Sequence, residues 1–464
     1  MTASGYFNGP WPAEDGGARR LQAPHGEQGL GIEAGESLSV LAARRVGGIQ
    51  MIVRGPGDSM YALRSILGRR ALLDPAETVI ERIDPITLES LAESPSLPAG
   101  PWWAGGLAVL ADGGVVAISG RWAHRLDPDS LQPTAARELP VDAPYNSFVA
   151  LADGTLVTKD FDRSLNRPAT LLALDPVTLE DRASPLRLPE TVIARLSADS
   201  TEIYAVGVNR AMRIRWDGAD LSLDDWQHHY RTGSGGGYGW DPVIAAGRLW
   251  FLDQGRHRFR LSMRGSGLDK GPVRLHSIPL DDASGATSVV ICGEPYGAIT
   301  NPPLIDPERM IAVGYDTANG RMTAFDIPET PSAEPTPRWR KAIDSGPHLL
   351  RWAETGEMLA CDHRAPWPLG TRSGSRLLDT ALSDALRLSG ERTPHLEPKL
   401  AERLAGEDAV VLDIETGEEK GRARLPVLSQ SVMFPTAGAN RDAILTTMTA
   451  IFRVGPGSPK PIQT

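Results

Sequence analysis

The chain has 464 residues, of which 41% are hydrophobic and 23% are charged, and its formal net charge is −10. This length allows two or three average domains or one large repeat fold, and the composition is typical of a globular protein. The acidic balance argues against a broad basic face for nucleic acid, and no apolar run approaches the roughly 18 residues that span a membrane.

The N-terminal residues 1–35 are polar, and no basic start is followed by an apolar stretch, so they do not resemble a signal peptide. We expect them to form a polar arm on the surface, with residues 36–464 as the folded body. The two cysteines, Cys292 and Cys361, are too few for a disulfide framework or a cysteine zinc site, and we expect both to fill core positions. Together these features predict a cytoplasmic protein.

Residues 101–140 contain a unit of short strands that recurs along the chain. An apolar strand at 107–110 leads through a tight turn into a second strand at 115–118, and a third strand ends at Leu126. A polar fourth strand ends near Glu138. The high content of glycine (48) and proline (38) is what many short strands and turns require.

Further copies of this unit have their first recognisable strands near residues 49, 148, 203, 243, 304, 349 and 432. The last copy stops one strand short, and residues 38–42 would supply that strand in a closed ring. A four-stranded unit repeated around an axis is a β-propeller, which protects its sheet edges by closure. We therefore predict an all-β fold, a single β-propeller of eight four-stranded blades. Seven blades are the alternative, because the first unit is irregular.

Four hairpins between third and fourth strands read RIDPITLES, RLDPDSLQP, LALDPVTLEDR and VLDIETGEEKGR. They resemble the hairpins of the quinoprotein-like β-propeller superfamily. The resemblance extends over most of the chain and implies the propeller architecture. The tryptophan that closes each such hairpin in quinone-dependent dehydrogenases is missing here, so the resemblance does not extend to the quinone cofactor, and such a dehydrogenase is disfavoured.

In a propeller, the loops that enter the innermost strands and the loops from second to third strands share one face, which we call the top face. Ligands of ring-shaped folds bind where such loops converge. The loops entering the innermost strands carry aromatic rings and amides, which suit a small, partly apolar molecule. The expected binding residues are Trp102, Trp103, Tyr145, Asn146, Tyr238, Trp240 and Asn301. The alternative is that the aromatic rings plug the channel and pack between blades.

The ends of the second strands carry four aspartates at matching positions, namely Asp160, Asp253, Asp316 and Asp362. Such carboxylates can bind Ca²⁺ or act as general acids and bases, and the alternative is a turn or ion pair in each blade. The catalytic candidates at this face are Lys159, Asp160, Asp316, His348, Asp362 and His363. No resident cofactor is predicted, and Ca²⁺ is kept as an option.

Residues 365–408 interrupt the seventh unit between its second and third strands. Leucines repeat there at four-residue steps, which predicts a pair of amphipathic helices on the top face. A lid over the site and a dimer contact or simple decoration are equally compatible with this insertion.

Two functions fit these patterns. The first is an enzyme that acts on a small, partly hydrophobic organic molecule at the top centre, by lyase, isomerase or hydrolase chemistry. The second is a non-catalytic propeller that binds a protein or metabolite through the same face. If the protein is an enzyme, we expect an acidic or basic side chain with a strongly shifted pKa that no ion pair explains. If it is a non-catalytic propeller, we expect the carboxylates to be held in salt bridges.

Overall fold

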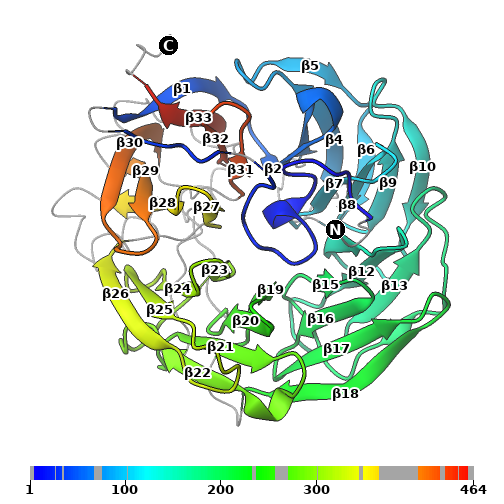
Figure 1. The fold of residues 1–464 in the computed structure, drawn as a ribbon. Helices are drawn as coiled ribbons and strands as arrows, with labels where there is room; N and C mark the ends of the chain where they lie inside the picture. The colour runs from blue at the N-terminus through cyan, green and yellow to red at the C-terminus, as the bar shows by residue number, and fades with distance from the viewer. Residues whose placement is uncertain are drawn as a thin grey trace, which may run out of the picture.

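The structure is a computed structural model that describes residues 5–26, 28–33, 36–66, 76–101, 103–231, 237–255, 270–299, 301–343, 348–364, 406–428, 434–447 and 449–457. Eight antiparallel sheets stand around one axis, with the innermost strand of each sheet at the centre (Figure 1). The predicted all-β propeller with eight blades is confirmed. Of the expected helical insertion at 365–408, residues 365–405 lie outside the described residues. Residues 406–408 are described, and they belong to a strand.

The strands follow each blade from the axis outward. Blades 1 to 4 consist of β2 (Ile49–Arg54), β3 (Met60–Ile66), β4 (Ala76–Ile83) and β5 (Ser90–Glu93); β7 (Gly106–Val109), β8 (Val115–Ser119), β9 (Trp122–Leu126) and β10 (Pro133–Glu138); β11 (Tyr145–Ala150), β12 (Leu156–Asp160), β13 (Thr170–Leu174) and β14 (Leu186–Arg187); and β15 (Ser197–Asp199), β16 (Glu202–Val206), β17 (Arg210–Trp216) and β18 (Leu221–His229). In blade 1, β6 (Leu97–Gly100) also pairs with β4.

Blades 5 to 8 continue in the same way. They consist of β19 (Val243–Ala245), β20 (Arg248–Leu252), β21 (Arg274–Pro279) and β22 (Thr287–Val290); β23 (Leu304–Asp306), β24 (Ile311–Asp316), β25 (Arg321–Asp326) and β26 (Thr336–Ala342); β27 (Leu350–Trp352), β28 (Glu357–Arg364), β29 (Gly406–Asp413) and β30 (Glu419–Leu428); and β31 (Thr436–Ala437), β32 (Ala443–Thr446), β33 (Ala450–Pro456) and β1 (Leu38–Arg45). Three short 3-10 turns are η1 (Glu14–Gly16), η2 (Pro56–Asp58) and η3 (Ala283–Gly285). Within the described ranges, no helix has the length and apolar character of a membrane span.

Two innermost strands differ from their predicted positions. In blade 4 the segment that begins at residue 203 is the second strand, and the innermost strand is the three-residue β15. In blade 8 the innermost strand is β31, whereas residues 432–433 of the predicted run 432–434 lie outside the described residues. Both strands are too short for a hydrophobic period to mark them.

The ring closes through the N-terminal strand. β1 pairs antiparallel with β33, with Leu38 opposite Pro456 and Arg45 opposite Ala450. The expectation that residues 38–42 complete the last blade is therefore confirmed. Because both ends of the chain contribute to one sheet, the ring has no open blade edge at the junction.

The four Asp-containing hairpins share one conformation. In the second blade, Asp127 Oδ1 accepts hydrogen bonds from the backbone N–H groups of Asp129 and Ser130, and the Leu131 N–H donates to the Asp127 carbonyl. Leu131 adopts a φ of 55° while its side chain is fully buried. The equivalent positions are Leu88, Leu179 and Gly417, with φ of 65°, 63° and 73°. Burial of the leucine side chain offsets the cost of its left-handed backbone.

The hydrophobic core lies between neighbouring blades. Tyr145 and Leu156 of blade 3, for example, pack with Ala108 and Val116 of blade 2 in one buried cluster. Cys361 is buried and Cys292 is half-buried, and both thiols are free. This packing leaves the axis of the ring to be filled by other residues.

Candidate functional site

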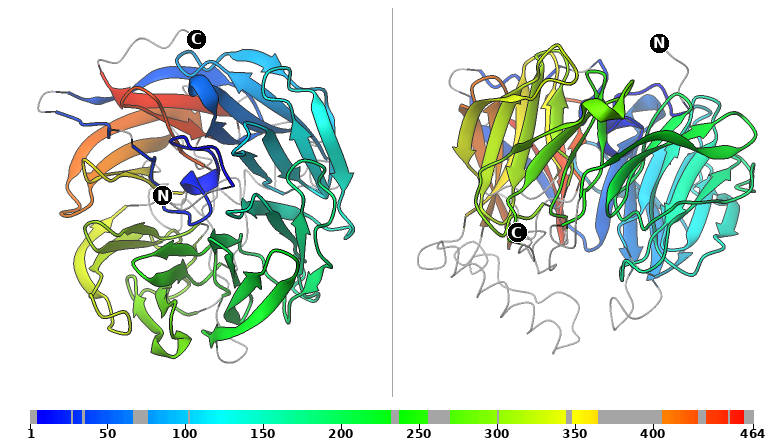
Figure 2. Two further views of the ribbon diagram at one scale, coloured as in Figure 1. Left: turned by 45° about the vertical axis from the view of Figure 1, so that its right-hand side comes forward. Right: turned by 90° about the horizontal axis from the view of Figure 1, so that it is seen from below.

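The N-terminal segment runs inside the ring. Figures 1 and 2 show a dark blue trace within the central opening, and we call residues 5–26 the axial segment. Residues 28–33 lie against blades 7 and 8, where the Gly31 N–H donates to Glu357 and Arg441 donates to the Leu30 carbonyl. Trp11 in the axial segment is only 1% exposed. The expectation of a polar arm on the surface is therefore wrong for the axial segment.

Backbone hydrogen bonds explain this position. Carbonyl groups of the axial segment accept from N–H groups on the innermost strands of five blades. These pairs are Trp11 with Arg54 (2.7 Å), Pro12 with Val109 (2.8 Å), Ala18 with Ala198 (2.9 Å), Arg19 with Ile244 (3.0 Å) and Gln22 with Arg351 (2.8 Å). These backbone N–H groups of the innermost strands therefore have hydrogen-bond partners on their axial side. The carbonyl groups of the segment bond to protein instead of water.

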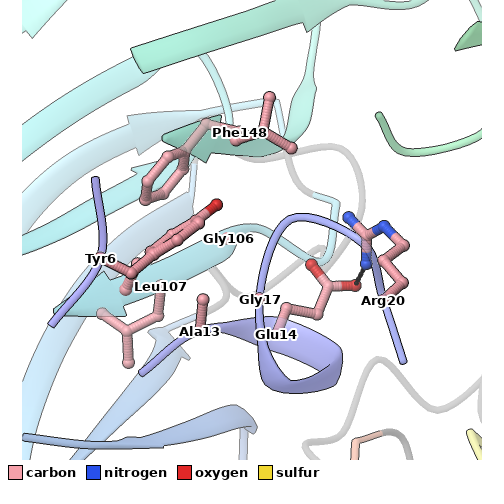
Figure 3. A pocket seen from close by; sticks show the side chains of 10 residues that line it. Tyr6, Ala13, Glu14, Gly17, Arg20, Gly106, Leu107 and Phe148 are labelled. Atoms are coloured by element: carbon pink, nitrogen blue, oxygen red, sulfur yellow. Dashed lines mark ion pairs between the residues drawn. The ribbon is translucent and has the colours of Figure 1, made fainter. Parts of the chain in front are cut away.

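A buried ionic cluster connects the axial segment to distant blades. The Glu14 carboxylate pairs with Arg20 (2.8 Å) and with Arg195 (2.6 Å), and Asp15 pairs with Arg20 (2.9 Å) and with His348 Nδ1 (2.7 Å). All five side chains are at most 7% exposed. Burial raises the pKa of Asp15, but His348 and Arg20 outweigh this effect and hold that pKa below its ordinary value. Figure 3 shows Glu14 and Arg20 beside a void of about 10 Å³ next to Tyr6 and Phe148.

The residues that meet this cluster occupy equivalent positions in their blades. Arg195, Asp241, His348 and Phe434 each stand two residues before an innermost strand. The guanidinium of Arg195 lies 4.8 Å from the Phe434 ring centroid, and its backbone N–H donates to Asp241 Oδ1 (2.6 Å). The His348 and Phe434 ring centroids are 4.3 Å apart. The predicted convergence of the loops that enter the innermost strands is therefore observed for His348.

Lys159 is the most unusual ionisable group near this cluster. Its side chain is fully buried at the end of β12, and Nζ donates to Asn146 Oδ1 (3.2 Å), while the Asn146 amide donates to the Ile193 carbonyl (2.7 Å). Burial lowers the pKa of Lys159 from 10.5 to about 7, although Asp160 and Asp241 act in the opposite direction. The Nζ atom also lies 5.4 Å from the Phe161 ring centroid.

Two further polar groups near the axis have no hydrogen-bond partner among the described residues. They are the hydroxyl of Tyr315, which is fully buried, and Oδ2 of Asp241, which is 1% exposed at the residue level. The nearest cation recorded for Asp241 Oδ2 is Arg195 Nε, at 3.7 Å. Burial raises the pKa of Tyr315 well above its ordinary value, and electrostatic interactions connect this residue to Asp15 and Asp241.

The predicted aromatic residues divide into two groups. Trp103 meets Phe161 edge-on at 5.1 Å, and Tyr238 stacks on Trp240 at 6.1 Å. These four side chains pack with one large hydrophobic cluster that also contains core residues of blades 5 to 7. Tyr145 instead lies between blades 2 and 3, where its hydroxyl accepts from the Val141 N–H (3.4 Å). Asn301 is 3% exposed, and Trp102 lies outside the described residues.

The predicted carboxylates do not gather into one site. Asp160 forms an ion pair with Arg167, and Asp362 pairs with Arg422 (3.0 Å), in each case within one blade. Asp253 lies 3.2 Å from His276 of its own blade. These contacts match the alternative interpretation of an ion pair in each blade. The side chain of His363 lies outside the described residues.

Asp316 differs from the other three aspartates because it has no ion-pair partner among the described residues. It accepts hydrogen bonds from Asn319 Nδ2 (2.6 Å) and the Ala298 N–H (3.3 Å), and it lies 3.5 Å from Cys292 Sγ. Burial raises the pKa of Asp316 above its ordinary value despite these hydrogen bonds. Asp316 therefore remains a candidate general acid, because a raised pKa favours its protonated form.

Among the described residues, the side chains of Glu14, Asp15 and His348 come close enough together to share a metal ion. Arg20 and Arg195 already neutralise both carboxylates. A divalent cation would lie against two guanidinium groups, so this group fits an ionic cross-link better than a metal site. The four aspartates predicted to bind Ca²⁺ form no such group among the described residues.

A cavity of about 700 Å³ opens at the face opposite the top face. The axial segment lines it with residues that include Phe7 and Arg19. Turns that follow innermost strands also line it, with residues that include Ala111 and Ser200. Sequence reasoning missed this cavity because the axial segment builds it. It also missed Asp241 and Arg195, and the signal that would have found them is their position two residues before an innermost strand.

No protein-family model matches the sequence, and no curated protein matches it. Solved structures do resemble the fold. The quinohemoprotein alcohol dehydrogenase from Comamonas testosteroni aligns with a TM-score of 0.60 and 10% identity, over 98% of this chain and 82% of that one. BamB from Moraxella catarrhalis aligns with a TM-score of 0.51 and 11% identity, over 90% and 99% of the two chains.

These similarities show the β-propeller fold, which is the architecture that the hairpin sequences implied. At 10–11% identity they concern the fold alone.

Proposed function

We propose that this chain is an enzyme that acts on a small, partly hydrophobic organic molecule at the top centre of the propeller. The proposed chemistry is proton transfer without a resident cofactor, as in a lyase, an isomerase or a hydrolase. The single observation that carries the proposal is Lys159, a fully buried amine whose one recorded hydrogen-bond partner is the neutral amide of Asn146.

An amine in this setting suits general-base chemistry. Its pKa of about 7 means that about half of the Lys159 side chains are neutral at neutral pH, which is the optimum for a group that must both accept and release a proton. Asn146 orients the amine, and Phe161 and Trp103 supply the apolar wall. Among the other candidates, Asp316 is the second titrating group, because burial raises its pKa.

The remaining candidates have supporting roles in this proposal. Asp160 and Asp362 are held by arginines of their own blades, and His348 is held by Asp15. A side chain committed to an ion pair is a poor proton carrier, since transfer would break the pair. The proposal therefore concentrates the acid–base role on Lys159 and Asp316.

The test is a direct titration of Lys159. Lysine amines are labelled by reductive ¹³C-methylation, and the resonance that disappears in Lys159→Met identifies this residue. We expect it to titrate near pH 7, and a midpoint above pH 9.5 contradicts the proposal. Lys341→Met is the matched control, because that amine donates to the Gly417 carbonyl at the outer strand β26.

A second function is favoured by the paired carboxylates. Asp160 and Asp362 lie in ion pairs, as a non-catalytic propeller that binds a protein or metabolite through the top face would have them. A panel of small aromatic acids, lactones and carbonyl compounds separates the two. Binding without turnover, with an affinity that is independent of pH between 6 and 8.5, supports the scaffold. Stoichiometric Ca²⁺ that is lost in Asp316→Ala would add a lactonase-like hydrolase to the enzyme proposal.

The proposal also includes a cytoplasmic location and no nucleic-acid or membrane partner. The net charge of −10 argues against a nucleic-acid partner.

A further inference from the structure

The cavity of about 700 Å³ on the face opposite the top face has no part in the proposed function. Its volume lies in the range of roughly 300–1,000 Å³ that is typical of small-molecule sites. The axial segment lines one side of the cavity. Turns of blades 2, 3 and 4 line the rest, with residues that include Ala111, Ala152 and Ser200. A space of this size between the axial segment and three blades is a candidate binding site.

An ion pair lies in the wall of this cavity. Arg19 Nη2 is 2.6 Å from Asp199 Oδ2, and the two side chains are 49% and 29% exposed. The backbone holds these residues side by side, because the neighbouring Ala198 N–H donates to the Ala18 carbonyl (2.9 Å). Among the described residues, neither side chain forms a further hydrogen bond. The second carboxylate oxygen and the other guanidinium N–H groups are therefore available to a ligand.

The other ionisable side chains of the lining do not change this arrangement of charge. The Arg20 guanidinium is buried and paired with two carboxylates of the axial segment. The Tyr6 hydroxyl accepts from the Ala150 N–H (2.8 Å), and burial raises the pKa of Tyr6 to about 12, so the phenol stays neutral. His25 is exposed, so water screens it.

A positive and a negative group in direct contact favour a ligand that carries both charges. A simple anion on Arg19 would lie beside the Asp199 carboxylate, and a simple cation on Asp199 would lie beside the guanidinium. A ligand with an ammonium and a carboxylate places each charge against its opposite, in a ring of four alternating charges. Since the two protein groups touch, the two ligand charges must also be close together, as they are in an α-amino acid.

The rest of the lining indicates the side chain of this ligand. Phe7, Pro12 and Leu21 are apolar, and many of the other lining residues are glycine or alanine, whose small side chains leave the space open. An aromatic or large aliphatic side chain suits such a wall, because it removes apolar surface from water on both partners.

We infer that this cavity binds a free α-amino acid with a large apolar side chain, with its carboxylate on Arg19 and its ammonium on Asp199. The site shares no residue with the proposed catalytic site on the opposite face. The inference therefore goes beyond the proposed function and does not depend on it.

Equilibrium dialysis of the full-length protein with radiolabelled L-phenylalanine at about pH 7.5 tests this inference. We expect saturable binding to one site per chain, with a Kd below about 1 mM. Hydrocinnamate and phenethylamine have the same apolar body with only the carboxylate or only the ammonium. Each should compete about tenfold more weakly than unlabelled L-phenylalanine, because each leaves one charge of the ion pair without its partner.

Three variants locate the binding. Arg19→Ala and Asp199→Ala should each weaken it about tenfold or more, because each removes one of the two charged contacts. Ala111→Trp should abolish it, because the indole fills the cavity while both charges stay in place. Arg338→Ala is the matched control, since Arg338 forms an equally short pair with Asp326 (2.7 Å) on the outer strands β26 and β25, far from the cavity lining.

Absence of saturable binding up to about 10 mM L-phenylalanine overturns the inference, and so does equally strong competition by either single-charge analogue. Full binding by Ala111→Trp would place the amino acid elsewhere on the chain and has the same consequence. The comparison of analogues uses the wild-type protein, so it decides the matter even if a variant does not fold. The titration of Lys159 tests the proposed function separately, because Lys159 does not line this cavity.

Discussion

His348 Nδ1 lies 2.7 Å from Asp15 Oδ1, and this contact joins residues that are 333 positions apart in the chain. Asp15 has a left-handed backbone with a φ of 54°, as do Arg20 (56°) and Gln22 (52°) of the same segment. Three strained residues in one short segment indicate that the contacts made there outweigh the backbone cost. The axial segment is therefore held in a defined conformation by the blades.

Replacement of Asp15 should show how much this contact stabilises the fold. We expect Asp15→Asn to lower the free energy of unfolding by about 3–5 kcal/mol at pH 7, because it removes one of the two carboxylates that pair with the buried Arg20 guanidinium. The folded-state pKa of Asp15 lies below its ordinary value of 3.8, so its contribution is complete above that pH and is lost as the pH falls through the folded value. Urea unfolding at pH 7 and pH 3.5 should show the gap to wild type narrowing at the lower pH.

The control for that variant is Asp142→Asn. Asp142 pairs with Arg121 at 3.2 Å but is 77% exposed, so we expect a change within about 0.5 kcal/mol. If the difference in unfolding free energy between wild type and Asp15→Asn does not change with pH, the loss of the Asp15 charge is not the cause of the destabilisation.

The Glu14–Arg195 pair should be energetically coupled. Glu14 belongs to the axial segment and Arg195 to the loop before β15, and their atoms are 2.6 Å apart. In a double-mutant cycle of Glu14→Gln and Arg195→Met, we expect the double variant to be more stable than the sum of the single losses by about 1–3 kcal/mol. Additive losses would mean that each residue acts separately, for example Arg195 through the carbonyls of Ala104 and Gly105.

Lys159 should make stability depend on pH in the opposite direction. Its folded pKa of about 7 lies below its ordinary 10.5, so the folded protein binds fewer protons than the unfolded chain between these values. Stability therefore rises with pH across this window, and the penalty of the buried amine is complete below pH 7. From pH 6 to pH 9.5, wild type should gain about 3 kcal/mol relative to Lys159→Met in urea unfolding. A constant difference would mean that the amine stays charged when buried.

The propeller itself was readable from local sequence. The Asp127 hairpin needs an aspartate that accepts nearby N–H groups and a residue in the left-handed region four positions along, and this requirement repeats at Asp84, Asp175 and Asp413. Because this turn is formed within five consecutive residues, its sequence pattern recurs in each unit and can be recognised in the sequence. The same reasoning found the missing strand at residues 38–42, because an incomplete last blade calls for one partner.

The centre of the ring was only partly readable. Trp103 and Trp240 were correctly assigned to the loops entering the innermost strands, and both pack in the cluster around the axis. The residue that meets Arg195, however, is Asp241, one position after Trp240. Successive side chains point in different directions, so an error of one position exchanges an axial side chain for one that packs to the side.

By itself, the sequence determined the repeat, since the repeat depends on hydrogen bonds and side-chain periodicity within about forty residues. It predicted eight blades with seven as the alternative, and it predicted the closing strand from the incomplete last unit. Only the tertiary structure decided that residues 5–26 occupy the axis and that Asp15 meets His348. Those contacts join segments that have no periodic relation to each other. The polar character of the N-terminal sequence is the same whether its polar groups bind water or the innermost strands of five blades, so the sequence alone does not distinguish the two.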